Sequence, residues 1–475
     1  MKYSLIASLI LQSTIVLVEL LPVYLQGPTP SHFRDIVRND TYDFGCRAVA
    51  KRSEDGSHYK LHAWLTEEQI EYLSKEYELV PEVSEDVGQE SHRPIGTGDR
   101  FGAGTISPVG LGTQASGKTI ASIMNVAEIK SAADALVKNY GIGSLTLPSK
   151  TFNGASQYAY YAGAGTDKSK YHLYFSAAVH ARERGGPDNI IYWVSDLLAA
   201  NKSGSGLVYG KKTYTNAQVK SVLAAGIVFF PLVNTDGVTY DQSSGSLWRK
   251  NRNTKSGSGG SSVGVDINRN FDFLWNFKKY FDASEAPAST SPSSEVFYGT
   301  AAASEPETKN LVSVYDSFPN IRWFMDIHSA VGDLLYSWGD DDDQTTTSTM
   351  NFLNSAYDGK RGPVGDSAYK EYIPAADLTN IRTVAAATVN AMKAVGGRAY
   401  TSIQAVGLYP RPAPVTTTPS PASGPSLGST RSTDTPWSLA LWKLLPDFGR
   451  VQHQHPGHKR GFMDWALAAI SVGLA

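Results

Sequence analysis

Two kinds of hydrophobic pattern alternate along the central part of the chain. Short, nearly continuous hydrophobic runs are typical of buried strands, and they occupy residues 171–179, 225–233 and 321–329. Hydrophobic positions with helical spacing predict helices, and they occupy residues 126–140, 189–201 and 377–396. Strands that alternate with helices are typical of an α/β fold, so we expect a mixed, largely parallel central sheet flanked by helices.

The N-terminal residues show a third pattern, in which Lys2 is followed by a long hydrophobic run. This arrangement is typical of a secretory signal peptide. Polar residues such as Gln12 and Glu19 interrupt the run before it is long enough to span a membrane. We therefore predict a signal peptide over residues 1–27 and an extracellular, secreted protein; the alternative is a membrane anchor.

Residues 28–117 differ in character from the central part. Thr66 and Gln69 have the spacing of a capping box, and the hydrophobic positions that follow have helical spacing, which predicts a short charged helix. The glycine-rich stretch 96–119 is typical of a linker. We interpret residues 28–117 as a small pro-region with its linker, and residues 118–410 as the main domain.

The composition is that of a globular protein without excess charge. The 475 residues are 41% hydrophobic, which is enough for a large core. A formal net charge of -2 leaves no basic excess to neutralise phosphates, so we expect no nucleic-acid partner. Cys46 is the only cysteine, so any metal must be held by His, Asp or Glu.

Two histidines follow predicted strands, at the place where active residues of α/β proteins lie. These are His180, with Glu183 three residues later, and His328. One His-x-x-Glu pair is a weak signal, but between residues 120 and 410 the only other histidine is His172, whose place inside a strand favours a structural role. Two imidazoles and one carboxylate leave a position open on Zn²⁺, as catalytic zinc requires.

A second group of residues is basic. Arg249 and Arg252 lie in "LWRKNRN", and Asn268 and Arg269 follow the β-like run "VGVDI". Single surface arginines are usually solvated. The Asn-Arg pair, however, offers an amide and a planar fork that suit bidentate capture of a carboxylate.

Together these segments resemble the zinc metallocarboxypeptidases of the carboxypeptidase A type. The matching motifs are "HARERGGPD", "NTDGVTY", "WRKNRN", "GVDINRNFD", "DIHS" followed by "LLYSWG", and "LYP". Their order and separation agree over residues 120–410, and the set is far more specific than any one motif. The resemblance implies a secreted proenzyme whose pro-region helix lies over the cleft, and whose substrates are peptide or protein C-termini. We expect a monomer with no membrane contact after signal removal.

The resemblance also implies a metal site with one Zn²⁺. His180, Glu183 and His328 would bind the ion, and Asp266 would hold the imidazole of His180 in its ligating tautomer.

The remaining implied roles concern the substrate. Arg252 would stabilise the oxyanion that develops on the scissile carbonyl. Asn268, Arg269 and Tyr409 would bind the C-terminal carboxylate, and Arg182 would line the cleft.

The resemblance stops at residues 411–475, which are rich in Pro, Ser and Thr. The family has a general-base glutamate in this part of the chain, but no glutamate follows Glu371 here. A slip of one nucleotide near Pro410 accounts for both features, because the altered frame permits a β-like run that ends in a glutamate in place of Ser438. We interpret residues 411–475 as an aberrant, frame-shifted tail, with the catalytic glutamate missing from the written chain.

Three other functions stay open. The written chain taken literally would be a catalytically inactive zinc- or peptide-binding relative of the family. The others are an amidohydrolase of the same fold and a secreted wall-associated module with a Pro/Ser/Thr stalk.

Overall fold

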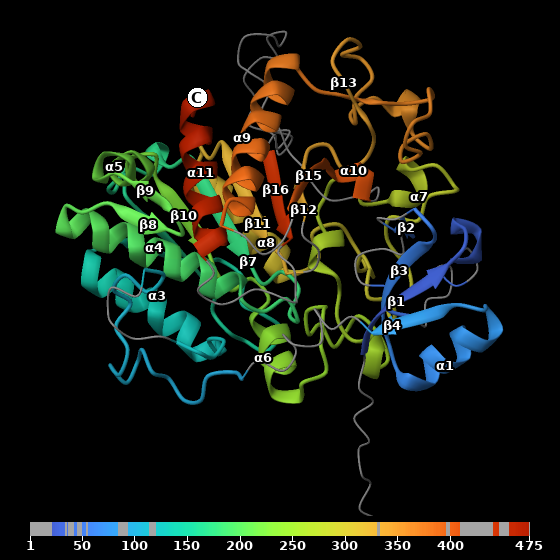
Figure 1. Cartoon of the computed structure of the whole chain (residues 1–475), viewed down its shortest axis with the longest axis horizontal. Coiled ribbons are helices and arrows are strands. Elements are labelled where there is room, and N and C mark those ends of the chain that lie inside the picture. Colours follow the sequence, from blue (N-terminus) through green and yellow to red (C-terminus); the bar gives the residue numbers. More distant parts are fainter. Residues whose placement is uncertain are drawn as a thin grey trace, which may run out of the picture.

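An eight-stranded sheet forms the centre of the larger part of the molecule (Figure 1). The computed structural model describes residues 21–33, 36, 42–44, 50–53, 56–83, 94–113, 120–329, 333–395, 400–408, 440–445 and 456–474. The strands of the sheet are β5 Gly143–Thr146, β6 Tyr158–Ala162, β7 Leu173–Ala177, β10 Ile227–Phe230, β11 Trp323–Ile327, β12 Asp333–Tyr336, β15 Thr401–Gln404 and β16 Ala440–Leu445. Their order across the sheet is β15-β12-β16-β11-β7-β10-β6-β5.

The middle of this sheet is parallel. β7 pairs in parallel with β10 on one side and β11 on the other, and β11 pairs in parallel with β16. Antiparallel pairs join β6 to β10 and β5, and β12 to β16. The mixed, largely parallel sheet predicted from the sequence is therefore confirmed.

Helices cover both faces of the sheet. They are α3 Val126–Tyr140, α4 Gly186–Ser203, α5 Asn216–Ala224, α8 Pro306–Ser317, α9 Ala375–Lys393 and α11 Pro456–Val472. Leu173 and Phe175 of β7 enter the core formed with α3, α4, α5, α9 and α11, whereas Tyr174 enters the core formed with α8. Because successive side chains of a strand point to opposite faces, burial on both faces explains the nearly continuous hydrophobic runs in the sequence.

The other elements of the large domain lie in the connections. They are β8 Leu207–Tyr209, β9 Lys212–Tyr214, α6 Thr235–Ser244, α7 Phe277–Tyr280, β13 Asp343–Gln344, β14 Glu371–Tyr372, α10 Ala405–Leu408, and the 3₁₀ turns η3 Lys168–Lys170, η4 Gly260–Ser262, η5 Ile267–Arg269 and η6 Ser355–Tyr357. Within the described ranges, no helix has the length and apolar character needed to cross a membrane.

A small four-stranded sheet lies beside the large domain (Figure 1). It consists of β1 Leu21–Gly27, β2 Lys51–Arg52, β3 Tyr59–Leu65 and β4 Val80–Val83, in the order β2-β3-β1-β4, with the turn η1 Pro30–Phe33 and the helix α1 Glu67–Glu76. The predicted helix is present. Thr66 and Gln69 cap it through reciprocal side-chain and backbone hydrogen bonds, as their spacing indicated.

Strand β1 corrects the expected end of the signal peptide at residue 27. β1 pairs with β3 on one side and β4 on the other, and Val23 and Leu25 are fully buried. Removal of residues 1–27 would take this inner strand out of the sheet and expose its core. A signal peptide therefore stays a prediction for the residues before Leu21, which lie outside the described part of the chain.

The glycine-rich stretch expected to be a linker packs on the large domain over residues 94–113. Phe101, Ile106 and Leu111 are buried in the main core. Arg100 forms an ion pair with Glu128 at the start of α3. The glycines allow the chain to turn, while the apolar side chains between them supply the packing. The large domain therefore begins before residue 118.

The C-terminal boundary expected at residue 410 also differs from the structure. Phe462 and Trp465 of α11 are fully buried in the main core, where α11 packs along α9. Lys212 donates a hydrogen bond of 2.6 Å to the carboxylate of Asp464. Part of the segment 411–475, which we set apart as an aberrant tail, thus belongs to the folded domain.

The written tail also supplies a strand of the main sheet. β16 lies between β11 and β12, with Ala440 opposite Trp323 and Leu444 opposite Ile327. We expected the corresponding strand to need a restored frame and to end at Ser438, a residue outside the described part of the chain. The segment "ALWKLL" forms this strand instead.

Candidate metal centre and substrate cleft

The loop after β7 carries the histidine and the glutamate singled out from the sequence. Backbone hydrogen bonds tie it to two neighbouring segments: the amide of Asn234 donates to the carbonyl of Ala178 (3.0 Å), and the amide of Ala181 donates to the carbonyl of Arg249 (3.0 Å). The side chain of Asn234 adds a bond from Nδ2 to the carbonyl of Val179 (3.1 Å). These contacts fix the loop at the carboxyl end of the sheet.

Two glycines turn the chain from this loop into α4. Gly185 has a φ of 88°, a left-handed conformation that other residues rarely adopt. A Cβ added to Gly186 would lie 3.0 Å from Cβ of Ala177, so a side chain there would crowd the end of β7. These two glycines therefore let α4 begin at Gly186, three residues after Glu183.

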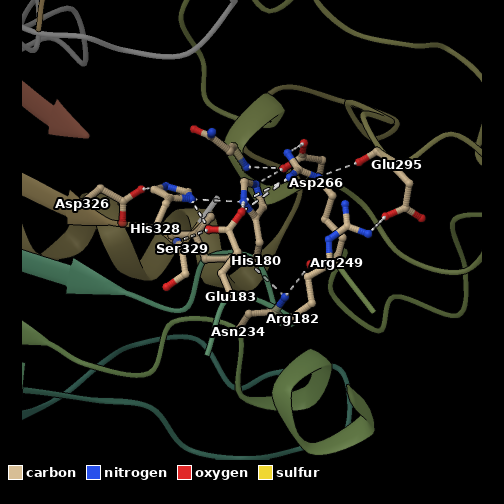
Figure 2. Close-up of polar contacts among 12 residues, drawn as sticks. His180, Arg182, Glu183, Asn234, Arg249, Asp266, Glu295, Asp326, His328 and Ser329 are labelled. Atoms are coloured by element: carbon tan, nitrogen blue, oxygen red, sulfur yellow. Dashed lines mark hydrogen bonds and ion pairs between the residues drawn. The ribbon is translucent and has the colours of Figure 1, made fainter. Parts of the chain in front are cut away.

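Three buried side chains converge at the carboxyl ends of β7 and β11 (Figure 2). Nδ1 of His180 lies 2.6 Å from Oε1 of Glu183, and Nδ1 of His328 lies 2.6 Å from Oε2 of the same carboxylate. The two Nδ1 atoms are 3.1 Å apart. The structure thus brings together the three residues predicted as zinc ligands, with one ligand atom from each within 4.8 Å of the others.

A second carboxylate lies behind each imidazole (Figure 2). Oδ1 of Asp266 lies 3.1 Å from Nε2 of His180, as the resemblance implied. Asp326, which we did not single out, contacts Nε2 of His328 in the same way. Arg249 donates from Nη2 to Asp266 (2.8 Å), and its Nη1 lies 3.2 Å from Nδ1 of His180.

Electrostatic interactions favour the ionised form of the carboxylates in this site. Burial alone would raise the pKa of Glu183, but the neighbouring His180 and His328 hold that pKa well below its ordinary value. Burial likewise opposes ionisation of Asp266, yet Arg249 and then His180 hold the pKa of its carboxyl group well below its ordinary value. Buried anionic oxygens beside imidazoles suit a divalent cation.

The donor set fits zinc. Two imidazole nitrogens and one carboxylate form the ligand set of a catalytic zinc site with one open position. The contact of each Nε2 with a carboxylate leaves each Nδ1 facing the shared centre, which is the tautomer a metal ligand needs. Elsewhere in the described part of the chain, no other group of three such residues converges in this way.

The predicted cleft arginine, Arg182, meets the small N-terminal sheet. Its Nη1 donates to Oδ2 of Asp43 (2.5 Å) and to the carbonyl of Leu247 (3.3 Å). Its guanidinium carbon lies 5.7 Å from the ring centroid of Trp64, and Oε2 of Glu295 lies 3.7 Å from Nη1. We expected the helix of the pro-region to cover the cleft. The pro-region residues that contact Arg182 are instead Trp64 of β3 and Asp43, which forms a β-bridge with Trp64, and not residues of α1.

Asn268 and Arg269 lie in the turn η5, next to the metal centre. Asn268 is buried, and its Nδ2 has no hydrogen-bond partner among the described residues. Arg269 is fully buried, and its Nε donates to the carbonyl of Pro287 (2.8 Å). Its Nη1 lies 3.9 Å from Oδ2 of Asp266. A buried amide donor without a partner, beside a guanidinium, can receive a carboxylate.

Arg252 lies in a different environment from the one that its expected role requires. Its guanidinium carbon is 3.7 Å from the ring centroid of Tyr240 and 4.5 Å from that of Trp248, so the side chain stacks on two aromatic rings. Stabilisation of an oxyanion would require it to leave this stack. Tyr409, expected to bind the substrate carboxylate, lies outside the described residues.

Three residues that contribute to the site had no assigned role in the sequence analysis. Arg249 was noted only as part of a basic segment, and Asn234 only as part of a motif. Asp326 could have been found from its position two residues before His328, because alternate residues of a strand point to the same face.

Comparison with known proteins finds carboxypeptidases. The zinc carboxypeptidase family matches residues 129–417. Carboxypeptidase A4 of Mus musculus is 33% identical over 193 residues, which are 40% of this chain and 40% of that protein. Carboxypeptidase B of Homo sapiens is 30% identical over 204 residues, which are 42% of this chain and 43% of that protein. The matched segment thus spans less than half the length of these relatives.

Solved structures extend the likeness of the fold to nearly the whole chain. The crystal structure of thrombin activatable fibrinolysis inhibitor has a TM-score of 0.62 at 17% identity, and covers 96% of this chain and 99% of that one. Carboxypeptidase A from Helicoverpa armigera has a TM-score of 0.61 at 16% identity, with the same coverage. At these identities the likeness shows the fold alone. Because the family match takes in more than half of the chain, including His180, Glu183 and His328, the chain belongs to the zinc carboxypeptidase family.

Proposed function

We propose that this protein is the secreted precursor of a zinc metallocarboxypeptidase, which removes C-terminal residues from peptides and proteins with one zinc ion. The observation that carries the proposal is that the metal-type cluster and the Asn-Arg pair meet at Asp266. Its Oδ1 lies 3.1 Å from Nε2 of His180 and accepts a hydrogen bond of 2.9 Å from the backbone amide of Asn268. Asn268 and Arg269 lie in the short turn that follows Asp266, so a substrate carboxylate bound by them would lie close to the metal. This proximity favours cleavage at a C-terminus.

His180, Glu183 and His328 would hold the ion. When bound, Zn²⁺ supplies Lewis-acid polarisation of the scissile carbonyl and lowers the pKa of water. Asp266 orients the imidazole of His180 so that Nδ1 faces the centre, and Arg249 fixes Asp266 in turn.

The substrate would be held by its terminal carboxylate. The Nδ2 of Asn268 is a buried donor that gains a partner when the carboxylate arrives, and Arg269 supplies the compensating positive charge. Arg252 would swing from its stack on Tyr240 and Trp248 to the developing oxyanion. Tyr409, which lies outside the described residues, stays a predicted partner of the same carboxylate.

The N-terminal sheet would keep the precursor silent. Asp43 pairs with Arg182, a residue of the loop that carries two of the metal ligands, and Trp64 packs over the same guanidinium. The carboxylate of Asp43, in the pro-region, therefore pairs with an arginine that we propose faces the substrate. Cleavage before residue 94 would remove this sheet and retain the packed segment 94–113 with the catalytic domain.

Whether the chain with this sequence is active depends on the general base. No glutamate follows Glu371, and loss of a general base typically lowers the rate ~10²–10⁴-fold. The packing of Phe462 and Trp465 favours the written frame for α11. We therefore propose that any shift of frame begins after residue 410 and ends before His458.

The alternative is a catalytically inactive relative that binds zinc or peptides. The absence of a glutamate after Glu371 favours it, as does the strand β16, which the written sequence forms without a restored frame. Such a protein would retain the metal cluster and the Asn268 donor and would bind a peptide C-terminus without cleaving it.

Sequencing the transcript from Leu408 to His458 and assaying both gene products would test these proposals. After removal of the N-terminal sheet, peptides ending in Arg, Phe or Ala would be the substrates. We expect hydrolysis from a frame-restored chain, and a rate lower by at least two orders of magnitude from the written one. A transcript that encodes the written tail, together with tight peptide binding and no hydrolysis, would favour the inactive relative.

A further inference from the structure

We propose that Asp326 is a positioning residue of the metal centre, which holds His328 in its metal-binding orientation and tautomer, and that Ser176 in turn holds Asp326. The inference rests on the proposed zinc function. Neither residue belongs to the set that the family resemblance implied for this chain.

Strand geometry places Asp326 behind His328. Asp326 lies on β11, two residues before the histidine, and alternate residues of an extended chain point to the same side. Its Oδ2 contacts Nε2 of His328, while Nδ1 of the same ring lies 2.6 Å from Oε2 of Glu183. The imidazole is therefore held at one nitrogen by Asp326 and presents the other to the shared centre.

Ser176 fixes the carboxylate from the neighbouring strand. β7 and β11 are parallel, and Ser176 lies directly opposite Asp326 in their register. The hydroxyl of Ser176 donates to Oδ1 of Asp326 at 2.6 Å. Both residues are buried, so the strand-to-strand contact orients the carboxylate that contacts the ring.

The two histidines of the cluster are thus held in the same manner by unrelated parts of the chain. Asp266 lies behind His180 and is fixed by Arg249, whereas Asp326 lies behind His328 and is fixed by Ser176. A carboxylate that accepts the outer N–H of a ligand histidine fixes its tautomer and raises its basicity, and such partners typically contribute 10–100-fold to metal affinity. The carboxylate therefore strengthens the ligand at the end of β11, independently of the catalytic base.

The full chain with Asp326→Asn tests this role, because the amide keeps the size of the side chain and loses its charge. We expect zinc affinity, measured by competition with a chromogenic chelator, to fall ~10–100-fold. Ser176→Ala, which retains the carboxylate, should weaken zinc binding in the same direction by a smaller factor. Asp333→Asn is the matched control, since Asp333 is a buried aspartate of β12, which β16 separates from β11, and it accepts a hydrogen bond from Thr401.

Two further readouts separate positioning from general structural damage. Cobalt substituted for zinc should show a changed absorption spectrum in Asp326→Asn and an unchanged one in Asp333→Asn, and Asp326→Glu should recover part of the affinity. Thermal unfolding of the metal-free proteins reports whether each variant folds. If Asp326→Asn does not fold, Ser176→Ala decides the test.

The outcomes distinguish this inference from the proposed function. If the unmodified chain binds no zinc, the proposed function itself is wrong. If that chain binds zinc, and folded Asp326→Asn or Ser176→Ala binds it with unchanged affinity and an unchanged cobalt spectrum, only the role of Asp326 is refuted.

Discussion

The carboxylate of Asp43, which forms a β-bridge with Trp64 of the small N-terminal sheet, accepts a hydrogen bond of 2.5 Å from Arg182, in the loop that carries His180 and Glu183. Arg182 is only 3% exposed, and Trp64 covers its guanidinium from the same sheet. One buried ion pair therefore links the proposed inhibitory domain to the proposed active site.

Loss of this ion pair should weaken the hold of the N-terminal domain on the large one. With residues 21–83 added in trans to a chain that begins at Pro94, we expect Asp43→Ala to lower the binding free energy by about 2–5 kcal/mol, because it leaves the charge of Arg182 buried. Calorimetry measures the change. The control is Glu82→Ala, which removes an exposed ion pair with Lys60 in the same domain. Equal losses in both variants would contradict a specific role for Asp43.

The metal site should bind about one equivalent of zinc in the full chain, and His180→Ala should abolish it, because catalytic zinc sites use three protein ligands. Elemental analysis after gel filtration measures the metal. His172→Ala is the control, since His172 is partly exposed and contacts the carbonyl of Asn320, away from the cluster. Zinc retained by His180→Ala, or absent from the unmodified protein, would argue against the site.

The segment 94–113 should stabilise the large domain. A chain that begins at Ile120 loses three buried side chains, Phe101, Ile106 and Leu111, and we expect the free energy of unfolding to be lower by several kcal/mol than in a chain that begins at Pro94, at ~1.5–3 kcal/mol for each buried side chain. Urea denaturation of the two chains measures the difference. Equal midpoints would mean that the segment acts as a linker after all.

Lys459 should stabilise the packing of α11. It is fully buried, and its Nζ donates to the carbonyl of Gly112 at 2.8 Å. Lys459→Met should lower the free energy of unfolding by ~1–3 kcal/mol, because the half-buried carbonyl of Gly112 loses its donor. Lys393→Met, at an exposed position of α9, should change stability little. If both substitutions have the same small effect, α11 does not pack as described.

Asp196 should make stability depend on pH. Burial raises its pKa from 3.8 to about 6, although Lys459 and the hydrogen bonds from Tyr209, Thr113 and Gly112 oppose the rise. A carboxyl group with a raised pKa in the folded state stabilises it at pH below 3.8, and this contribution is lost as pH rises through 6.

The unmodified protein should therefore lose up to about 3 kcal/mol between pH 4 and 7 relative to Asp196→Asn, which cannot ionise at this position. Chemical denaturation of the two proteins across this pH range measures the difference. Parallel pH profiles would show that Asp196 keeps its ordinary pKa in the fold.

The hydrophobic pattern by itself determined the fold class and the strands that carry the site. Runs such as 171–179 and 321–329 are buried on both faces, and only strands in the middle of a covered sheet need such continuous hydrophobic sequence. The position of His180 just after the first run, and of His328 at the end of the second, was sufficient to place both histidines at the carboxyl end of the sheet. The capping box at Thr66 was likewise readable, because it is a local interaction between residues three apart.

Tertiary structure alone decided the boundaries and the partners. The segments 94–113 and 456–472 have little local signal, because glycines, prolines and short apolar groups acquire a role only against a surface far away in the sequence. The sequence pattern also gives no sign of the contact of Asp43 with Arg182, which is 139 residues away, or of Ser176 with Asp326, which is 150 residues away. Such contacts arise from sheet register and domain docking, which depend on the packing of the whole core, whereas a pattern along the chain reports only neighbours within a strand or a helical turn.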